Sequence, residues 1–278
     1  MNKKPDWLRI PYFDSNSSEE VLKLLKELKL NTVCIEADCP NRAECFSNKT
    51  ATFMILGVNC TRKCTFCNVS FGEPESVDTE EPRKIANAVQ RLSLRYVVIT
   101  SVTRDDLSDG GASHFSSVLR EVKIKNPTTA VEVLIPDLKS LDVIINESPA
   151  VIGHNIETVE SLYKDVRPGA DYARSLGVLK SVKQINPRIR TKSGIMLGLG
   201  ESRNEILKVF DDLLDTGCDF LTIGQYLSPT KNHYQVKEYI QPRFFSEYKE
   251  IALEKGFRYV ASGPFVRSSF KAGSALIF

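Results

Sequence analysis

The chain has 278 residues, 42% hydrophobic and 26% charged, which is enough to bury a complete core and is ordinary for a globular protein. Its 37 Lys and Arg residues nearly balance its 35 Asp and Glu residues, so the net charge of +2 gives no basis for nucleic-acid binding. No apolar run reaches the roughly 18 residues that a membrane span needs, and the first residues lack the apolar run of a secretory signal. We therefore expect a cytoplasmic protein that binds neither nucleic acid nor membrane.

The first predicted element is an amphipathic helix over Val21–Leu28, where apolar residues recur at helical spacing. The segment after it, Asn31–Asn48, contains three cysteines and a proline but shows no hydrophobic periodicity. We interpret this segment as an irregular loop that needs an external organiser, such as a metal cluster.

From Thr52 onward, short apolar strands alternate with helical stretches, a pattern typical of a parallel sheet covered by helices. Six such units are too few for the closed eight-unit barrel, so we predict an α/β fold in the form of an open, partial (β/α)6 barrel. The predicted strands are Phe53–Val58, Tyr96–Val102, Val131–Ile135, Val151–His154, Ile189–Leu197 and Phe220–Tyr226, and the predicted helices among them are Arg83–Leu92, Phe115–Lys125, Tyr172–Ile185, Asn204–Thr216 and Phe244–Lys255.

Three cysteines, Cys60, Cys64 and Cys67, follow the first predicted strand, with three and then two residues between them. Thiolates are the ligands of iron–sulfur clusters, and three protein ligands to a four-iron cubane leave one iron free for a small molecule. A zinc site is the alternative. Structural zinc normally has four protein ligands, and the fourth could come from the cysteines upstream.

A second group of cysteines, Cys34, Cys39 and Cys45, lies upstream at intervals of five and six positions. These intervals are too wide for one compact ferredoxin or zinc knuckle, and they suit a loop wrapped around a second cluster. Redox-sensitive or zinc-binding cysteines would show a similar pattern. The seventh cysteine, Cys218, is flanked by apolar residues and is predicted to be a core residue.

The triplet, with an aromatic residue before its last cysteine, resembles the signature of the radical S-adenosylmethionine superfamily. The upstream cysteines, with Cys39-Pro40-Asn41 and Glu44-Cys45, resemble the auxiliary-cluster motif of the lipoyl synthase family. Similar motifs continue along the chain at Thr100–Leu107, Asp109–Ala112, His114-Phe115, Gly153–Thr158, Val166–Tyr172, Lys192–Glu201, Thr222–Leu227 and Arg267–Ala272. The chain departs from the family in having Phe270-Lys271 where Tyr-His is usual, and Thr103 where Asp is more frequent.

The resemblance implies insertion of two sulfur atoms, at C6 and C8, into an octanoyl chain that is amide-linked to a lysine of a carrier protein. It implies two 4Fe–4S clusters, with S-adenosylmethionine as co-substrate. Cys60, Cys64 and Cys67 would hold the radical-generating cluster. The auxiliary cluster would be held by Cys34, Cys39, Cys45 and, through the second serine of the closing motif, Ser269.

As contacts for S-adenosylmethionine we select Thr100, Asn155, Glu157 and Arg174, with Arg174 placed to pair with the carboxylate. The expected partners are octanoylated lipoyl carrier domains or the glycine-cleavage H protein, and an electron donor such as ferredoxin or flavodoxin. We expect an N-terminal extension over residues 1–51 with the auxiliary-cluster cysteines. The partial barrel would span 52–260, and a C-terminal extension with the serine ligand would span 261–278.

Two rival interpretations follow from the same cysteines. A biotin synthase or methylthiotransferase would also use radical chemistry, but its auxiliary ligands are placed differently. A zinc-binding interaction protein without enzymatic activity could use all six clustered cysteines. Iron and acid-labile sulfide in the brown protein would separate both enzyme classes from the colourless zinc protein.

Overall fold

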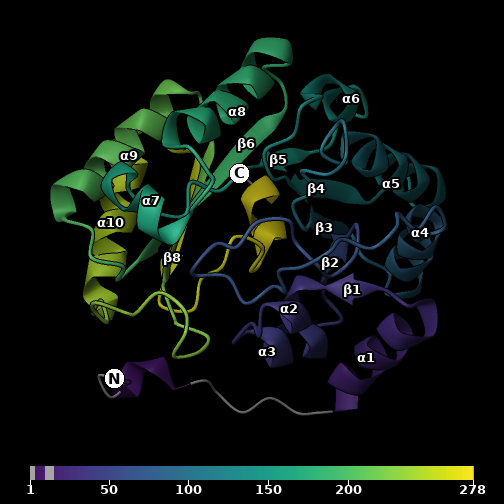
Figure 1. Cartoon of the computed structure of the whole chain (residues 1–278), viewed down its shortest axis with the longest axis horizontal. Coiled ribbons are helices and arrows are strands. Elements are labelled where there is room, and N and C mark those ends of the chain that lie inside the picture. Colours follow the sequence, from purple (N-terminus) through teal and green to yellow (C-terminus); the bar gives the residue numbers. More distant parts are fainter. Residues whose placement is uncertain (1–3, 10–15, 278) are drawn as a thin grey trace.

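The computed structural model describes residues 4–9 and 16–277, which form one curved sheet covered by helices (Figure 1). The strands follow one another in sequence order across the sheet, and every neighbouring pair is parallel except β1 and β2. The order ends at β1 on one side and β8 on the other, so the described sheet is open. The strands are β1 (Asn31–Thr32), β2 (Thr52–Ile55), β3 (Tyr96–Ser101), β4 (Ala130–Leu134), β5 (Val151–Gly153), β6 (Arg190–Leu197), β7 (Phe220–Gln225) and β8 (Tyr259–Gly263).

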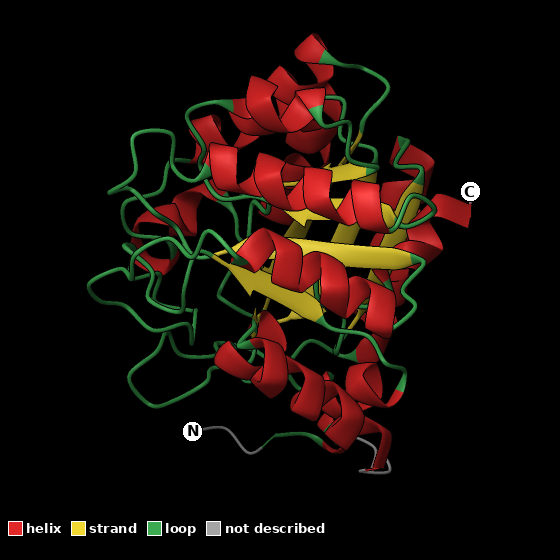
Figure 2. Ribbon diagram, turned by 90° about the vertical axis from the view of Figure 1, so that its right-hand side faces the viewer, coloured by secondary structure: helices red, strands yellow, loops and turns green. Residues whose placement is uncertain are grey.

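Helices connect the parallel strands and cover the outer face of the sheet (Figure 2). In α9, for example, Ile206, Val209, Phe210 and Leu213 recur at helical spacing and are all buried. The helices are η1 (Asp6–Leu8), α1 (Asn16–Leu28), α2 (Val33–Glu36), α3 (Arg42–Ser47), α4 (Glu81–Arg91), α5 (Ala112–Lys125), α6 (Leu141–Asn146), η2 (Glu160–Leu162), α7 (Tyr163–Val166), α8 (Tyr172–Ile185), α9 (Arg203–Asp215), α10 (Pro242–Lys255) and η3 (Ala272–Ile277).

The predicted open α/β architecture is confirmed, and the six predicted strands correspond to β2–β7. β8 was not predicted, because only three apolar residues precede its Ser-Gly end. The expectation of an irregular loop over Asn31–Asn48 was wrong, since β1, α2 and α3 form there. Elements of two to six residues are too short to show a period in the sequence. No helix in the described ranges is long and apolar enough to cross a membrane.

The C-terminal segment after β8 runs along the inner face of the sheet. A Cβ atom at Gly224 in β7 would lie 2.2 Å from the carbonyl oxygen of Val266, so the segment packs directly on that strand. Farther on, Ala275 in η3 packs against Val151 and Phe220, the first residues of β5 and β7. The segment therefore crosses from the carboxyl ends of the strands to their amino ends.

A buried ion pair fills the inner face near the amino ends. The Lys192 Nζ atom lies 2.6 Å from Glu132 Oε1, and the two side chains are 4% and 1% exposed. The Tyr96 hydroxyl donates to the same carboxylate. The hydrogen-bonding groups of these three side chains are therefore used among themselves, and η3 covers the amino ends of the strands. Polar side chains that could bind a ligand on the inner face are expected near the carboxyl ends.

The close approach at Gly224 predicts a specific destabilisation. We expect Gly224→Ala to lower the free energy of unfolding by about 1–3 kcal/mol, because the Val266 backbone must move away from β7. Thermal denaturation measures the loss, and limited proteolysis should cut the displaced C-terminal segment faster. Gly177→Ala in α8 is the matched control, since a Cβ there would meet nothing within 4 Å and alanine favours a helix. Equal stability of the two variants would contradict the packing of this segment.

Candidate functional site

The cysteine triplet lies in the loop that leaves the carboxyl end of β2. The turn before it is strained, because Leu56 has a φ of 69°, a left-handed conformation that is rare for a bulky side chain. Both backbone groups of Leu56 are bonded to side chains: Glu81 accepts from its N–H at 3.0 Å, and Arg104 donates to its carbonyl at 3.1 Å. Two side chains thus hold a strained turn at the start of the triplet loop.

The triplet thiols lie close together. Burial raises the pKa of the Cys67 thiol to about 12, and nearby Cys64 and Cys60 contribute in the same direction. The sulfur of Cys60 accepts from the backbone N–H groups of Arg62 and Thr103, at 3.4 and 3.3 Å. Hydrogen bonds to sulfur are a feature of thiolates that bind iron–sulfur clusters.

The loop between β7 and α10 covers the triplet. Tyr234 donates its backbone N–H to the Thr65 carbonyl at 2.8 Å. His233 Nε2 lies 3.1 Å from the carbonyl oxygen of Cys67, which can only accept, so this nitrogen donates. These contacts attach the covering loop to the backbone of the triplet.

The upstream cysteines form a second group on the short helices. Cys34 lies in α2, Cys45 lies in α3, and Cys39 lies between them. Burial raises the pKa of Cys45 to about 12, and Cys34 and Cys39 add to this shift. Burial also raises the pKa of Cys39, against the opposing positive charge of Arg267. The free thiols of Cys39 and Cys45 are therefore protonated at neutral pH, and metal binding would release their protons.

The C-terminal segment is attached to the loop that carries the upstream cysteines. Asn41 Nδ2 donates to the Phe265 carbonyl at 2.7 Å, and Lys271 Nζ lies 3.0 Å from Glu44 Oε1. Ser269 lies half-buried between these two attachment points. Lys271, which replaces the family's usual histidine, thus holds the segment through an ion pair.

The residues present fit two clusters. Within the described ranges, no three His, Cys, Asp or Glu side chains lie close enough to hold a single metal ion. A cubane makes a weaker demand on proximity, because each of its thiolates binds a different iron. The two cysteine groups supply three thiols each, and thiolate is the ligand type that these clusters take.

Two of the residues selected for S-adenosylmethionine lie beside the triplet. Glu157 is half-buried in a left-handed conformation with a φ of 66°, and its carboxylate contributes to the raised pKa values of both Cys64 and Cys67. Asn155 Nδ2 donates to Glu157 Oε1 at 3.0 Å, which leaves the buried Asn155 Oδ1 without a partner among the described residues. A Cβ at Gly194 would lie 3.1 Å from that oxygen, so glycine keeps the space open.

The other two selected residues are placed differently. The Thr100 hydroxyl donates to the Leu134 carbonyl at 2.9 Å, so its proton is used within the sheet. Arg174 is on α8 with a side chain 57% exposed, and its Nη1 lies 3.9 Å from Asp137 Oδ2.

Further polar groups at this site were not predicted from the sequence. Ser101 Oγ, Asp137 Oδ1, His154 Nε2 and Arg167 Nε are buried and have no hydrogen-bond partner in the described part of the chain. Unpaired buried polar atoms are costly, so their clustering near the carboxyl ends of β3–β5 fits a polar ligand. For Ser101, Asp137 and His154, a position at or just after the end of a parallel strand was the signal that could have identified them, whereas Arg167 follows α7 and gave no such signal.

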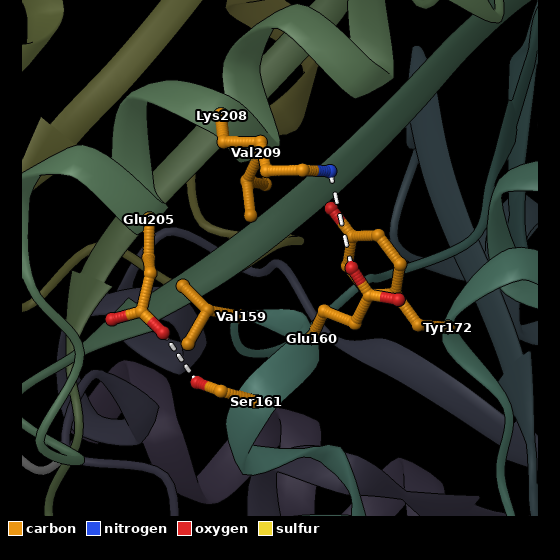
Figure 3. A pocket seen from close by; sticks show the side chains of 7 residues that line it. All are labelled: Val159, Glu160, Ser161, Tyr172, Glu205, Lys208 and Val209. Carbon is orange, nitrogen blue, oxygen red and sulfur yellow. Dashed lines mark hydrogen bonds and ion pairs between the residues drawn. The ribbon is translucent and has the colours of Figure 1, made fainter.

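A cavity of about 300 Å³ lies apart from the cysteines, between η2, α8 and α9 (Figure 3). Its charged groups are paired within the chain: Glu205 accepts from Ser161, and Lys208 Nζ lies 2.6 Å from Asp212. Glu205 also completes the cap of α9. The cavity is therefore part of the packing of these helices. Its lining residues are Val159, Glu160, Ser161, Tyr172, Glu205, Lys208 and Val209.

Comparison with known sequences places this geometry in a family. Residues 54–213 match the model of the Radical SAM superfamily. A lipoyl synthase of Caldicellulosiruptor saccharolyticus is 58% identical over 97% of this chain and 96% of that protein. A lipoyl synthase of Alkaliphilus metalliredigens is 54% identical over 99% of this chain and 97% of that protein.

Solved structures show the same fold at low sequence identity. Methylornithine synthase superposes with a TM-score of 0.58 at 14% identity, over 88% of this chain and 78% of that one. The FeFe-hydrogenase maturase of Carboxydothermus hydrogenoformans gives a TM-score of 0.59 at 12% identity, over 95% of this chain and 79% of that one.

Proposed function

The chain belongs to the lipoyl synthase family of radical S-adenosylmethionine enzymes. From this membership we propose which of its residues bind each cluster and which bind S-adenosylmethionine. It is a sulfurtransferase of lipoate biosynthesis that uses a 4Fe–4S cluster and S-adenosylmethionine. The interpretation as a non-enzymatic zinc protein is thereby wrong.

The observation that carries the proposal is the presence of two separate cysteine groups, each with thiols near one another. We assign Cys60, Cys64 and Cys67 to the radical-generating cluster. We assign Cys34, Cys39, Cys45 and Ser269 to the auxiliary cluster. The attachments at Asn41 and Glu44 support Ser269, because they hold its segment against the upstream cysteine loop.

When bound, the first cluster and S-adenosylmethionine supply a radical that removes hydrogen from C6 and C8 of the octanoyl group, and the auxiliary cluster supplies the sulfur. An alkyl C–H bond has no acidic proton, so the protein positions the reactants and excludes water instead of acting as acid or base. Asn155, Glu157 and Arg174 would orient S-adenosylmethionine, and Thr100 would line its site. The alkoxide of Ser269 is a harder ligand than thiolate, so it would leave one corner of the auxiliary cluster labile.

The substrate class follows from the family. We propose an octanoyl group on a lysine of a lipoyl carrier domain or of the glycine-cleavage H protein, with electrons from a donor such as ferredoxin or flavodoxin, in the cytoplasm. We keep the proposed domain limits of 1–51, 52–260 and 261–278 for the chemistry that each part carries, although β8 (Tyr259–Gly263) runs across the limit at residue 260.

An isotope experiment tests the auxiliary site as sulfur donor. The protein is reconstituted anaerobically with 34S-sulfide and then reacted with octanoyl carrier, reductant and S-adenosylmethionine in the presence of unlabelled free sulfide. We expect two heavy sulfurs in the first-turnover product and about one lipoyl group per chain, because the donor cluster is consumed. A reaction without S-adenosylmethionine is the control and should give no product. Light sulfur in the product, with the auxiliary cluster intact afterwards, would mean that this cluster is only an electron relay.

A further inference from the structure

Two buried side chains face each other near the carboxyl ends of β4 and β5 with no donor between them. Asp137 Oδ1 lies 3.5 Å from His154 Nε2, and the side chains are 8% and 2% exposed. Both atoms lack a hydrogen-bond partner among the residues that the structure describes. The other polar atom of each residue is engaged: Asp137 Oδ2 binds Arg62, and His154 Nδ1 lies 2.9 Å from the Ile135 carbonyl.

The protonation of the pair makes both free atoms acceptors. The Ile135 carbonyl can only accept, so His154 Nδ1 carries the hydrogen. Burial, assisted by the positive charge of Arg167, lowers the pKa of His154 to about 4, so the imidazole is neutral at neutral pH and Nε2 bears a lone pair. Although burial opposes its ionisation, Asp137 has a lowered pKa because Arg62 donates to it. Two buried acceptors thus point at one place, an arrangement that costs stability unless a donor fills it.

We propose that Asp137 Oδ1 and His154 Nε2 together accept hydrogen bonds from a donor of bound S-adenosylmethionine, either its amino group or a ribose hydroxyl. This assignment rests on the proposed function. The octanoyl chain has no donor along its alkyl part, so the reacting part of the substrate does not satisfy the pair. Asp137 also contacts residues that we place near S-adenosylmethionine. Arg62, its ion-pair partner, belongs to the triplet loop, and Arg174 Nη1 lies 3.9 Å from Asp137 Oδ2.

The variant Asp137→Asn tests the pair, because its amide can supply the missing N–H to His154 while its oxygen still accepts from Arg62. In anaerobic protein with its clusters reconstituted, we expect about a 10- to 100-fold rise in the Kd for S-adenosylmethionine by calorimetry. Iron content should be unchanged, and the melting temperature of the cluster-free protein should be equal or higher. Asp105→Asn is the matched control: it removes the other carboxylate that pairs with Arg62, at 2.9 Å, and should change the Kd by less than about twofold.

A second variant and a second ligand complete the test. His154→Phe removes one acceptor and should also weaken binding, which keeps the proposal testable if Asp137→Asn folds poorly. 5′-Methylthioadenosine retains the ribose but lacks the amino acid part. Weaker binding of this ligand to Asp137→Asn identifies the hydroxyl as the donor, whereas unchanged binding identifies the amino group. If both variants bind S-adenosylmethionine with wild-type affinity, the inference is overturned, and the donor between Asp137 and His154 is a water molecule. Failure of the wild-type protein to bind S-adenosylmethionine would instead contradict the proposed function.

Discussion

Replacing Cys67 with alanine should abolish reductive cleavage of S-adenosylmethionine. The radical-generating cluster has only three protein ligands in our assignment, and Cys67 is the one whose backbone carbonyl is bonded to His233 in the covering loop. The upstream cysteines are untouched, so the iron content should fall to about half rather than to zero. Formation of 5′-deoxyadenosine, followed by mass spectrometry, and iron per chain measure the two effects.

Cys218→Ala is the control for this variant. Cys218 is a buried free cysteine, and it belongs to neither group because its sulfur lies 3.4 Å from the Phe220 carbonyl in the β7 region. Cys218 is buried in the core, as predicted. The Cys218→Ala variant should therefore retain both clusters and the cleavage activity. Undiminished 5′-deoxyadenosine formation in Cys67→Ala would contradict the assignment of the triplet.

Replacing Cys39 with alanine should give the complementary result. Cleavage of S-adenosylmethionine should persist, because the triplet loop keeps all of its ligands, but no sulfur should appear in the octanoyl product. The positive charge of Arg267 acts on the Cys39 thiol. The same guanidinium also interacts with Glu157 beside the triplet. Loss of this thiol therefore removes one of the four ligands that we assign to the auxiliary cluster.

Mass spectrometry of the carrier after an anaerobic reaction measures the outcome for Cys39→Ala. Octanoyl carrier that has lost hydrogen without gaining sulfur would support the assignment. Lipoyl groups made at the wild-type rate would show that the upstream cysteines are structural or redox-sensing instead. The Cys67 and Cys39 variants together separate radical generation from sulfur insertion.

The sequence by itself determined the order of the elements and the location of the chemistry. Alternating apolar strands and helical stretches identified β2–β7, because strand and helix periods are properties of a few consecutive residues. The spacing of Cys60, Cys64 and Cys67 identified the triplet for the same reason. The role of Ser269 came only from the family resemblance, since an isolated serine near a chain end carries no pattern.

The tertiary structure alone decided which distant groups meet. Asn41 and Phe265 are 224 positions apart, yet the crossing of the C-terminal segment joins them. Asp137 and His154 belong to different strand ends and share no local motif, so no pattern in the sequence pairs their free acceptor atoms. The physical reason is that parallel strands bring their carboxyl ends to one edge, where side chains from separate loops converge only after the sheet has formed.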